Sequence, residues 1–121
     1  MAEDERISLG PEEAVALWIQ GREVWNAWVE NNPDADISFE YTNFEEHPHI
    51  DQGWGNHYSF AGYFFPRGKA TFEYALFGDG AIDFDGAIFP GEDTSFKDVF
   101  FGAGNISFRR TIFKGNVSFY G

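Results

Sequence analysis

Phenylalanine recurs along the second half of the chain at two alternating spacings. From Phe60 onward the spacings run 5, 7, 5, 7 and so on, and only the last differs, at 6 residues. The series comprises Phe60, Phe65, Phe72, Phe77, Phe84, Phe89, Phe96, Phe101, Phe108, Phe113 and Phe119. Two places before each Phe stands a small, β-branched or tyrosine residue. Because side chains alternate in direction along extended backbone, each unit is predicted to be a short strand that directs two side chains inward.

Turn-forming residues separate these units, as at Asp85-Gly86, Pro90-Gly91 and Lys114-Gly115-Asn116. Glycine and asparagine at such corners can adopt the positive φ that a sharp turn requires. Short strands joined by corners cannot bury an apolar face alone and must stack on copies of themselves. The pattern therefore predicts a repeat architecture in which the strands stack row upon row.

Four successive spacings cover 24 residues, so rings this far apart are expected to lie in columns. Two such columns are Phe60 with Phe84 and Phe108, and Phe65 with Phe89 and Phe113. This geometry is a parallel β-helix, with neighbouring coils about 4.8 Å apart. Its core would be filled by stacked aromatic ladders. The rings from Phe60 to Phe113 are the predicted structural ladder.

The segment before the regular series repeats its spacing irregularly. Phe39 and Phe44 lie five residues apart, and Ile50, Trp54 and Phe60 continue at irregular steps. Terminal repeats usually differ from the internal ones because they serve as caps. We interpret residues 37–59 as an irregular first coil and residues 60–121 as regular coils.

Residues 11–31 follow a different period, typical of an amphipathic helix. Apolar or small residues recur at steps of three and four, at Ala14, Leu17, Trp18, Gly21, Val24, Trp25, Trp28 and Val29. Pro11 suits the first helical position, Asn31-Asn32-Pro33 ends the helix, and Gly21 can divide it in two. The open end of a β-helix exposes unpaired backbone. We therefore expect residues 1–36 to form a helical cap, with Trp18, Trp25 and Trp28 as a core plug rather than a ligand site.

The repeat units resemble those of the pentapeptide-repeat family, in its Phe-centred variety. The matching units include Ala70-Thr71-Phe72, Ala75-Leu76-Phe77, Ala87-Ile88-Phe89 and Val99-Phe100-Phe101. The resemblance implies an all-β solenoid, a right-handed quadrilateral parallel β-helix with four five-residue faces per coil. Every second unit here has seven residues, so two corners per coil should bulge outward. The stretch from Gln20 to Trp28 also resembles a helical leader that precedes the β-helix in many prokaryotic members.

Composition limits the classes of function. The chain has 121 residues, of which 20% are aromatic, and this indicates one domain with a packed core. Its 20 acidic and 8 basic residues give a net charge of −12, so we expect no direct binding to nucleic acid or to an anionic membrane. It has no cysteine, three of its first six residues are acidic, and no apolar run reaches the ~18 residues of a membrane span. We expect a soluble, cytoplasmic protein.

The acidic residues suggest one partner surface. Residues 1–36 carry a net charge of −7 and residues 37–121 a net charge of −5. Within the repeats, the candidate acidic surface comprises Glu73, Asp79, Asp83, Asp85, Glu92, Asp93 and Asp98. Some family members that protect DNA gyrase resemble duplex DNA in size and charge, which implies a DNA-mimic role as an alternative. About three and a half coils would span about 17 Å, only half of a DNA turn of about 34 Å.

Candidate chemistry is sparse in this sequence. The histidines His47, His49 and His57 lie close together beside several acids, and a pair two residues apart can chelate a divalent metal. Pro48 weakens this reading, and a surface loop in the first coil is preferred. No nucleophile motif, phosphate-binding loop or dinucleotide fingerprint is present. We therefore expect no enzyme, no cofactor and no metal.

The expected function is that of a non-enzymatic protein-interaction or scaffold module with a protein partner. The chain ends at Gly121, about half a coil after Phe108, with no polar helix to follow. Either a longer chain continues beyond this point, or the open C-terminal end pairs with a second copy as a homodimer. The alternative is an acidic DNA mimic that regulates a topoisomerase or another DNA-binding protein.

Overall fold

The computed structural model describes residues 7–44, 57–77, 81–102, 104 and 106–119. Their regular structure consists of short strands and two helices. In chain order these are β1 (Ser8–Leu9), α1 (Pro11–Trp18), α2 (Arg22–Asn31), β2 (Asp36–Ser38), β3 (His57–Ser59), β4 (Ala70–Thr71), β5 (Ala81–Asp83), β6 (Ile88–Phe89), β7 (Asp93–Ser95), β8 (Ile106–Ser107), β9 (Ile112–Phe113) and β10 (Asn116–Ser118).

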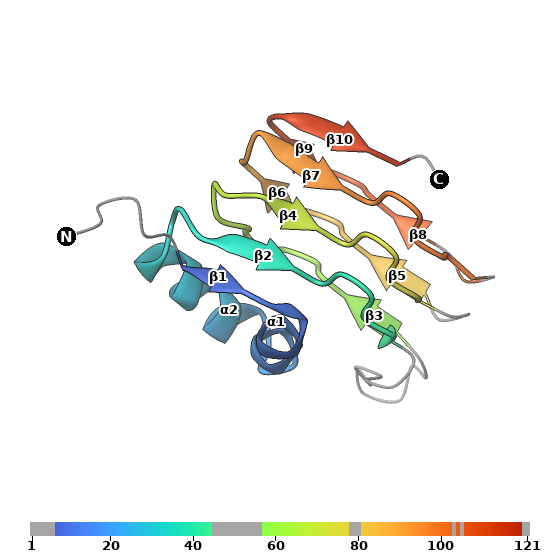
Figure 1. Cartoon of the computed structure of the whole chain (residues 1–121), viewed down its shortest axis with the longest axis horizontal. Helices are drawn as coiled ribbons and strands as arrows, with labels where there is room; N and C mark the ends of the chain where they lie inside the picture. Colours follow the sequence, from blue (N-terminus) through green and yellow to red (C-terminus); the bar gives the residue numbers. More distant parts are fainter. Residues whose placement is uncertain (1–6, 45–56, 78–80, 103, 105, 120–121) are drawn as a thin grey trace.

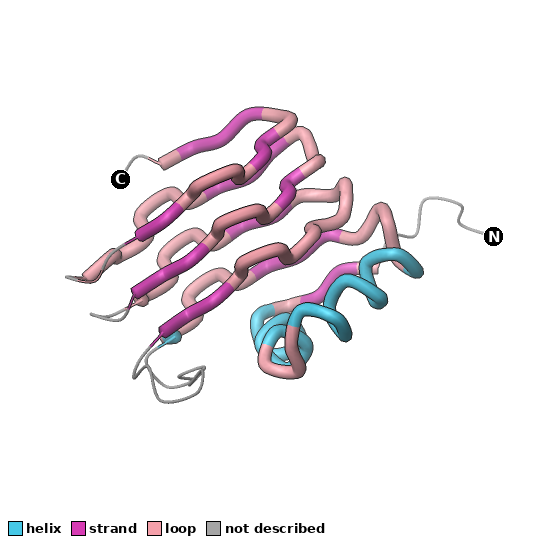
Figure 2. The backbone as a smooth tube through the Cα atoms, turned by 180° about the vertical axis from the view of Figure 1, so that it is seen from behind, coloured by secondary structure: helices cyan, strands magenta, loops and turns pink. Residues whose placement is uncertain are grey.

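The strands form parallel sheets in two layers. The front layer is the five-stranded sheet β1-β2-β4-β7-β10, and the back layer contains the sheets β3-β5-β8 and β6-β9. Figures 1 and 2 show these layers from opposite sides, with α1 and α2 beside β1 and β2 at one end. The prediction of a mostly β chain with short parallel strands and N-terminal helices is confirmed.

The pairing register repeats along the chain. Paired residues are 24 positions apart in the middle of both layers, as for Ala70 with Thr94 and Ile82 with Ile106. In the front layer, the step from Leu9 to Ile37 is 28 positions, the next, from Ile37 to Ala70, is 33, and the last is 23. The shortened last step matches the six-residue spacing that precedes Phe119. We call each stretch of one layer that pairs in this way a row.

A β-turn divides each row that continues through described residues. The carbonyl of Phe72 accepts a hydrogen bond from the amide of Ala75 at 3.0 Å, and equivalent bonds begin at Phe39, Phe60, Phe84, Phe96 and Phe108. The second residue after each Phe has a positive φ. These residues are Tyr41, Gly62, Tyr74, Gly86, Asp98 and Arg110. The turn therefore follows the first Phe of every five-residue unit.

Glycines at the six- and seven-residue corners are required by close backbone packing, and not by the positive φ that the sequence predicts. A Cβ on Gly91 would lie 2.3 Å from the carbonyl oxygen of Gly68, and one on Gly68 would lie 2.2 Å from that of Ala35. Gly115, in the last and six-residue corner, is crowded in the same way by Glu92. These corners need glycine because successive backbones pass too close for any side chain.

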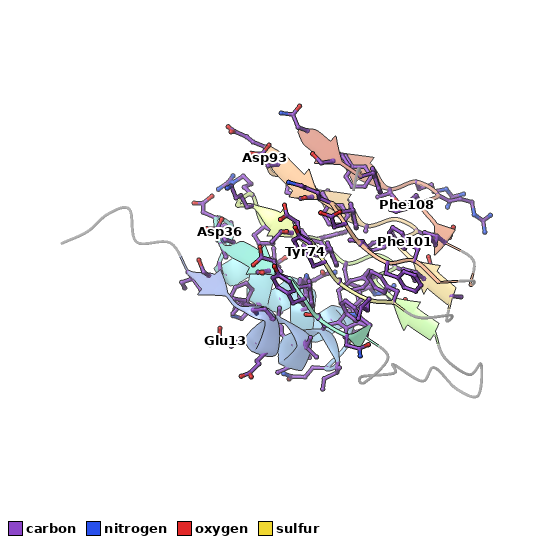
Figure 3. All side chains as sticks on the ribbon, turned by 45° about the vertical axis from the view of Figure 1, so that its right-hand side comes forward. Glu13, Asp36, Tyr74, Asp93, Phe101 and Phe108 are labelled. Carbon is purple, nitrogen blue, oxygen red and sulfur yellow. The ribbon has the colours of Figure 1, made fainter. Side chains whose placement is uncertain are left out.

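Aromatic rings from both layers meet between the sheets and form the core. Neighbouring rings within a column are 4.3–5.7 Å apart between centroids, and their planes differ by at most 25°. The columns are Phe60–Phe84–Phe108, Phe65–Phe89–Phe113, Phe39–Phe72–Phe96–Phe119 and Phe44–Phe77–Phe101. The rings become more exposed toward the C-terminal end, where Phe119 is 52% exposed. Phe101 and Phe108 at that end are labelled in Figure 3.

Candidate functional site

The two helices place three aromatic or amide side chains against the first rows. The predicted helix over residues 11–31 is divided at Gly21, whose φ is +103°. Trp18 stacks on Phe60 with centroids 5.2 Å apart, and Trp25 stacks on Phe39 at 6.0 Å. Both indoles are fully buried. They extend two aromatic columns by one ring each at the N-terminal end.

Side chains of the helices also replace the backbone bonds that a preceding row would make. The indole N–H of Trp18 donates to the Ser59 carbonyl at 2.8 Å, and that of Trp25 donates to the Phe64 carbonyl at 2.9 Å. One row later, the carbonyls of Asp83 and Ile88 accept equivalent bonds from backbone amides at 2.7 and 2.8 Å. The cap therefore satisfies a sheet edge that would otherwise be exposed.

Asn26 completes this edge. Its side-chain amide donates to the Gly62 carbonyl at 3.0 Å and accepts from the Phe64 amide at 2.8 Å. In the next row the Ile88 amide donates to the Tyr63 carbonyl at 3.1 Å. Trp28, the third predicted plug residue, is only partly buried against the core. The sequence pattern of the helix did not single out Asn26, because its role depends on where the amide meets the sheet.

The front layer is covered differently at its N-terminal end. β1 pairs with β2, with Ser8 opposite Asp36 and Leu9 opposite Ile37. This strand was not predicted, although an isolated alternation at Ile7-Ser8-Leu9 is present in the sequence. After Leu9 the chain turns away into α1, so β1 covers only the first part of the front row.

A buried tyrosine ties α1 to the back layer. The hydroxyl of Tyr63 donates to the Trp18 carbonyl at 3.1 Å, and the side chain is 2% exposed. Burial raises the pKa of Tyr63 to about 12, although the nearby charge of Arg22 opposes this. The phenol is therefore neutral at physiological pH and acts as a donor to the end of α1.

The predicted acidic surface is divided between the two layers. Asp83 and Asp85 belong to the back layer, whereas Glu73, Asp93 and Asp98 belong to the front layer (Asp93 is labelled in Figure 3). Glu92 lies at the corner before β7, and Asp79 lies outside the described residues. The structure does not bring the described members of this set together on one face.

Two of these carboxylates bind serine side chains of the next row. The hydroxyl of Ser95 donates to Glu73 at 2.8 Å, and that of Ser107 donates to Asp85. The bond from Ser107, with further help from Arg109, holds the pKa of Asp85 below its ordinary value despite partial desolvation. These two carboxylates already connect rows and are less available to a partner.

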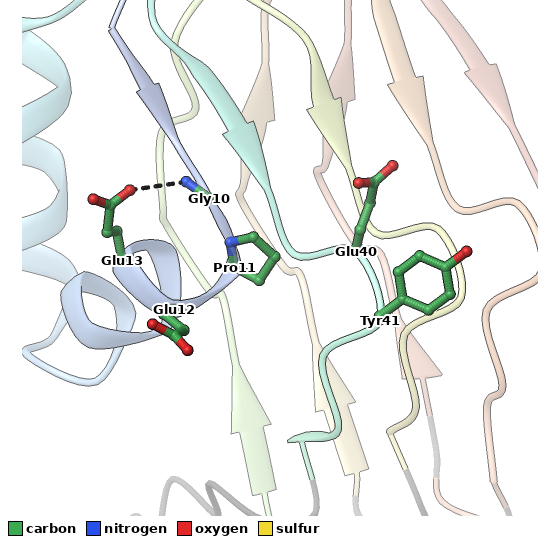
Figure 4. Close-up of a pocket in the computed structure, with 6 residues that line it drawn as sticks. All are labelled: Gly10, Pro11, Glu12, Glu13, Glu40 and Tyr41. Atoms are coloured by element: carbon green, nitrogen blue, oxygen red, sulfur yellow. Dashed lines mark hydrogen bonds between the residues drawn. The ribbon is translucent and has the colours of Figure 1, made fainter.

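Two adjoining hollows lie between α1 and the first front row. One is lined by Gly10, Glu12, Glu13, Glu40 and Tyr41, together with Pro11 (Figure 4). The other, of about 400 Å³, is lined by Val15 and Ala16 of α1, by Ile19 directly after that helix, and by Thr42 and Asn43. Sequence reasoning missed this place because its residues come from two separate elements with no shared motif.

The histidine hypothesis lies mostly outside the described residues. His47 and His49 fall in the range 45–56, and His57 belongs to β3, where it pairs with Ala81. Within the described part of the chain, no three His, Asp or Glu side chains gather as a cation site.

The same described ranges contain no helix with the length and apolar character needed to span a membrane. Three features of the described chain remain as candidates for function: the capped N-terminal end, the divided acidic surface and the hollows beside α1. Comparison of the chain with protein-family models, with curated proteins and with solved structures gave no match.

Proposed function

We propose that residues 37–121 form a right-handed quadrilateral β-helix of the pentapeptide-repeat type, capped by residues 1–36. The recurring register of 24 residues supports this architecture, as do the β-turn in each row and the four columns of stacked rings. The resemblance of the repeat units to that family gave the handedness and the four-sided section. The cytoplasm is the compartment that fits this proposal, since the chain has no cysteine.

The function that fits this architecture best is a non-enzymatic protein-interaction or scaffold module. The observation that carries the proposal is the interior, which is filled by stacked aromatic side chains from both layers. Outward residues such as Thr71 and Ser95 repeat in register and build continuous faces. Repeat proteins use extended surfaces of this kind to bind other proteins.

Affinity capture with the purified chain tests this function. A bound protein would be identified, purified and titrated against the wild-type chain and two charge-reversed variants, Asp93→Lys on the front layer and Asp83→Lys on the back layer. Saturable binding that one variant loses and the other keeps is the expected result, since a partner would contact one layer. If no protein binds saturably, the interaction function is wrong.

A second function, regulation of a topoisomerase or another DNA-binding protein by an acidic DNA mimic, is favoured by the net charge of −12. The division of the carboxylates between two layers counts against it, because a phosphate backbone presents its charge continuously. A second copy paired through the C-terminal end would lengthen the charged surface. Gyrase supercoiling assayed at micromolar protein separates the two functions: inhibition favours the mimic, and unchanged activity favours the module.

A further inference from the structure

The hollow between α1 and residues 41–43, which we call the α1 groove, borders a sheet edge that β1 leaves uncovered. β1 pairs with Asp36 and Ile37 only, and the chain then enters α1 at Pro11. The equivalent edge of the back layer is satisfied by Trp18, Trp25 and Asn26. The front row after its β-turn has no such cover from β1.

An unsatisfied hydroxyl marks this edge. Thr42 lines the groove and is 7% exposed, and its Oγ1 has no hydrogen-bond partner among the described residues. A buried hydroxyl without a partner costs free energy, and native chains usually provide one. The groove therefore offers a hydrogen-bond donor, the Thr42 hydroxyl, to a bound molecule.

Thr111 shows what a threonine at this position binds. Both threonines donate their backbone amide to the Phe three residues earlier, so they occupy the same place in the row. The hydroxyl of Thr111 donates to the carbonyl of Phe84, in the preceding row, at 2.8 Å. By this comparison, the Thr42 hydroxyl is placed to donate to a main-chain carbonyl of a segment lying beside the first row.

The lining of the groove defines the side chains of such a segment. Val15 of α1 and Ile19, directly after that helix, offer an apolar wall, and Ile19 is 50% exposed. The carboxylates of Glu12 and Glu40 lie at the adjoining hollow, with no side-chain partner among the described residues and no basic side chain in its lining (Figure 4). Alternating apolar and basic side chains would suit both walls, because an extended segment directs them to opposite sides.

We propose that the α1 groove binds an extended, basic segment of a partner protein, which lies beside Thr42 and accepts a hydrogen bond from the Thr42 hydroxyl at a main-chain carbonyl. Its apolar side chains pack on Val15 and Ile19, and its Lys or Arg side chains lie near Glu12 and Glu40. The inference rests on the proposed interaction function and names the site and chemical class of the partner.

A peptide titration followed by nuclear magnetic resonance tests the proposal. The probe is the capped hexapeptide acetyl-Val-Lys-Val-Lys-Val-Lys-amide, and its control is the same peptide with Glu in place of Lys. We expect the basic peptide to bind at least about tenfold more tightly, with amide shifts confined to residues 12–19 and 40–43. Equal binding of both peptides, no binding, or shifts elsewhere would overturn the proposal.

Matched variants separate the two interactions. Thr42→Val keeps the shape of the side chain and should weaken binding of the basic peptide about fivefold, whereas Thr111→Val should leave it unchanged. The pair Glu12→Gln and Glu40→Gln should weaken it about tenfold and remove its salt dependence. The pair Glu30→Gln and Glu92→Gln removes the same charge from exposed positions outside the groove and should have no effect.

Failure of the groove proposal can be distinguished from failure of the proposed interaction function. If a captured partner binds the Thr42→Val variant as tightly as the wild-type chain, the proposed binding at the α1 groove is wrong. The proposed interaction function would still stand. A captured partner that loses affinity for this variant supports both. Unchanged affinity of the basic peptide for Thr42→Val also overturns the groove.

Discussion

Four of the six residues with positive φ in the β-turns carry a side chain. Gly62, Gly86 and Arg110 occupy the same position in successive back rows, with φ of 72°, 74° and 59°. A left-handed conformation costs a residue with a Cβ about 1–2 kcal/mol, whereas glycine adopts it freely. Arg110 is exposed, so its side chain offers little burial to offset that cost.

Arg110→Gly should therefore stabilise the protein. The expected gain in the free energy of unfolding is about 0.5–1 kcal/mol, after the greater flexibility of glycine in the unfolded chain is subtracted. Urea unfolding of the variant beside the wild type measures it. Gly86→Ala, the reverse change at the same turn position, should destabilise by a similar amount. A loss of stability on Arg110→Gly would show that the backbone of Arg110 is not strained.

Tyr63 makes stability depend on alkaline pH. The neutral phenol is the form held in the fold, so its folded pKa, about 12, lies above the unfolded value near 10. Its contribution is thus fully present below pH 10 and is lost as the pH rises toward 12, at up to about 1.4 kcal/mol per pH unit.

Tyr63→Phe removes this titration together with the bond to the Trp18 carbonyl. The variant should be about 1 kcal/mol less stable at pH 7 but should lose less stability than the wild type between pH 10 and 12. Thermal unfolding across this range gives both quantities. Parallel pH profiles of the two proteins would show that Tyr63 does not carry the effect.

At the level of elements, the cap depends on side chains that act as backbone. Asn26 supplies both a donor and an acceptor to the first back row, so Asn26→Ala leaves the Gly62 carbonyl and the Phe64 amide without these partners. We expect a loss of about 1–3 kcal/mol in the free energy of unfolding. Asn31→Ala is the control, since the exposed Asn31 amide donates to the Ala27 carbonyl within α2. Equal effects of the two changes, measured by urea unfolding, would contradict this role of Asn26.

The corners give a steric test. Gly91→Ala would place a Cβ against the backbone oxygens of Gly68 and Arg67, and neither can move without opening the neighbouring corner. We expect destabilisation by about 3 kcal/mol. At Gly10 the nearest atom to an added Cβ is 3.9 Å away, so Gly10→Ala should change stability by less than about 0.5 kcal/mol. A fully stable Gly91→Ala variant, judged by its melting temperature, would show that the corner can relax.

The sequence predicted the elements whose cause is local. The spacing of the rings indicated short strands in parallel register, and the three-to-four period indicated the helices. The cap bonds and the α1 groove were not predicted, because the direction of an indole N–H and the lining of a groove beside Thr42 depend on elements distant in sequence. The turns at Tyr41 and Tyr74 were also not predicted, since positive φ is rare for tyrosine.

For the whole molecule, the register of 24 residues predicts which deletions are tolerated. Removing residues 70–93 joins Lys69 to Thr94, and Thr94 is the register partner of Ala70, so it can take that place opposite Ile37. We expect a folded chain with a cooperative thermal transition in circular dichroism. This outcome would also support the proposed β-helix.

A shorter deletion serves as the control. Removing residues 70–87 deletes less of the core but leaves Phe65 and Phe89 six residues apart, out of phase with the rows. This variant should show no cooperative transition. Similar melting of both deletions, or loss of folding only in the longer one, would contradict stacking by a fixed register.

The cap at the N-terminal end has a consequence for how the chain folds during its synthesis. The helices and the first rows leave the ribosome before the rows that stack on them, and each later row pairs with one already made. At about 5–20 residues per second, a stretch of 24 residues emerges in about 1–5 s. Local pairing takes microseconds. Each row therefore has time to settle on its predecessor, and the nascent chain exposes only its newest edge.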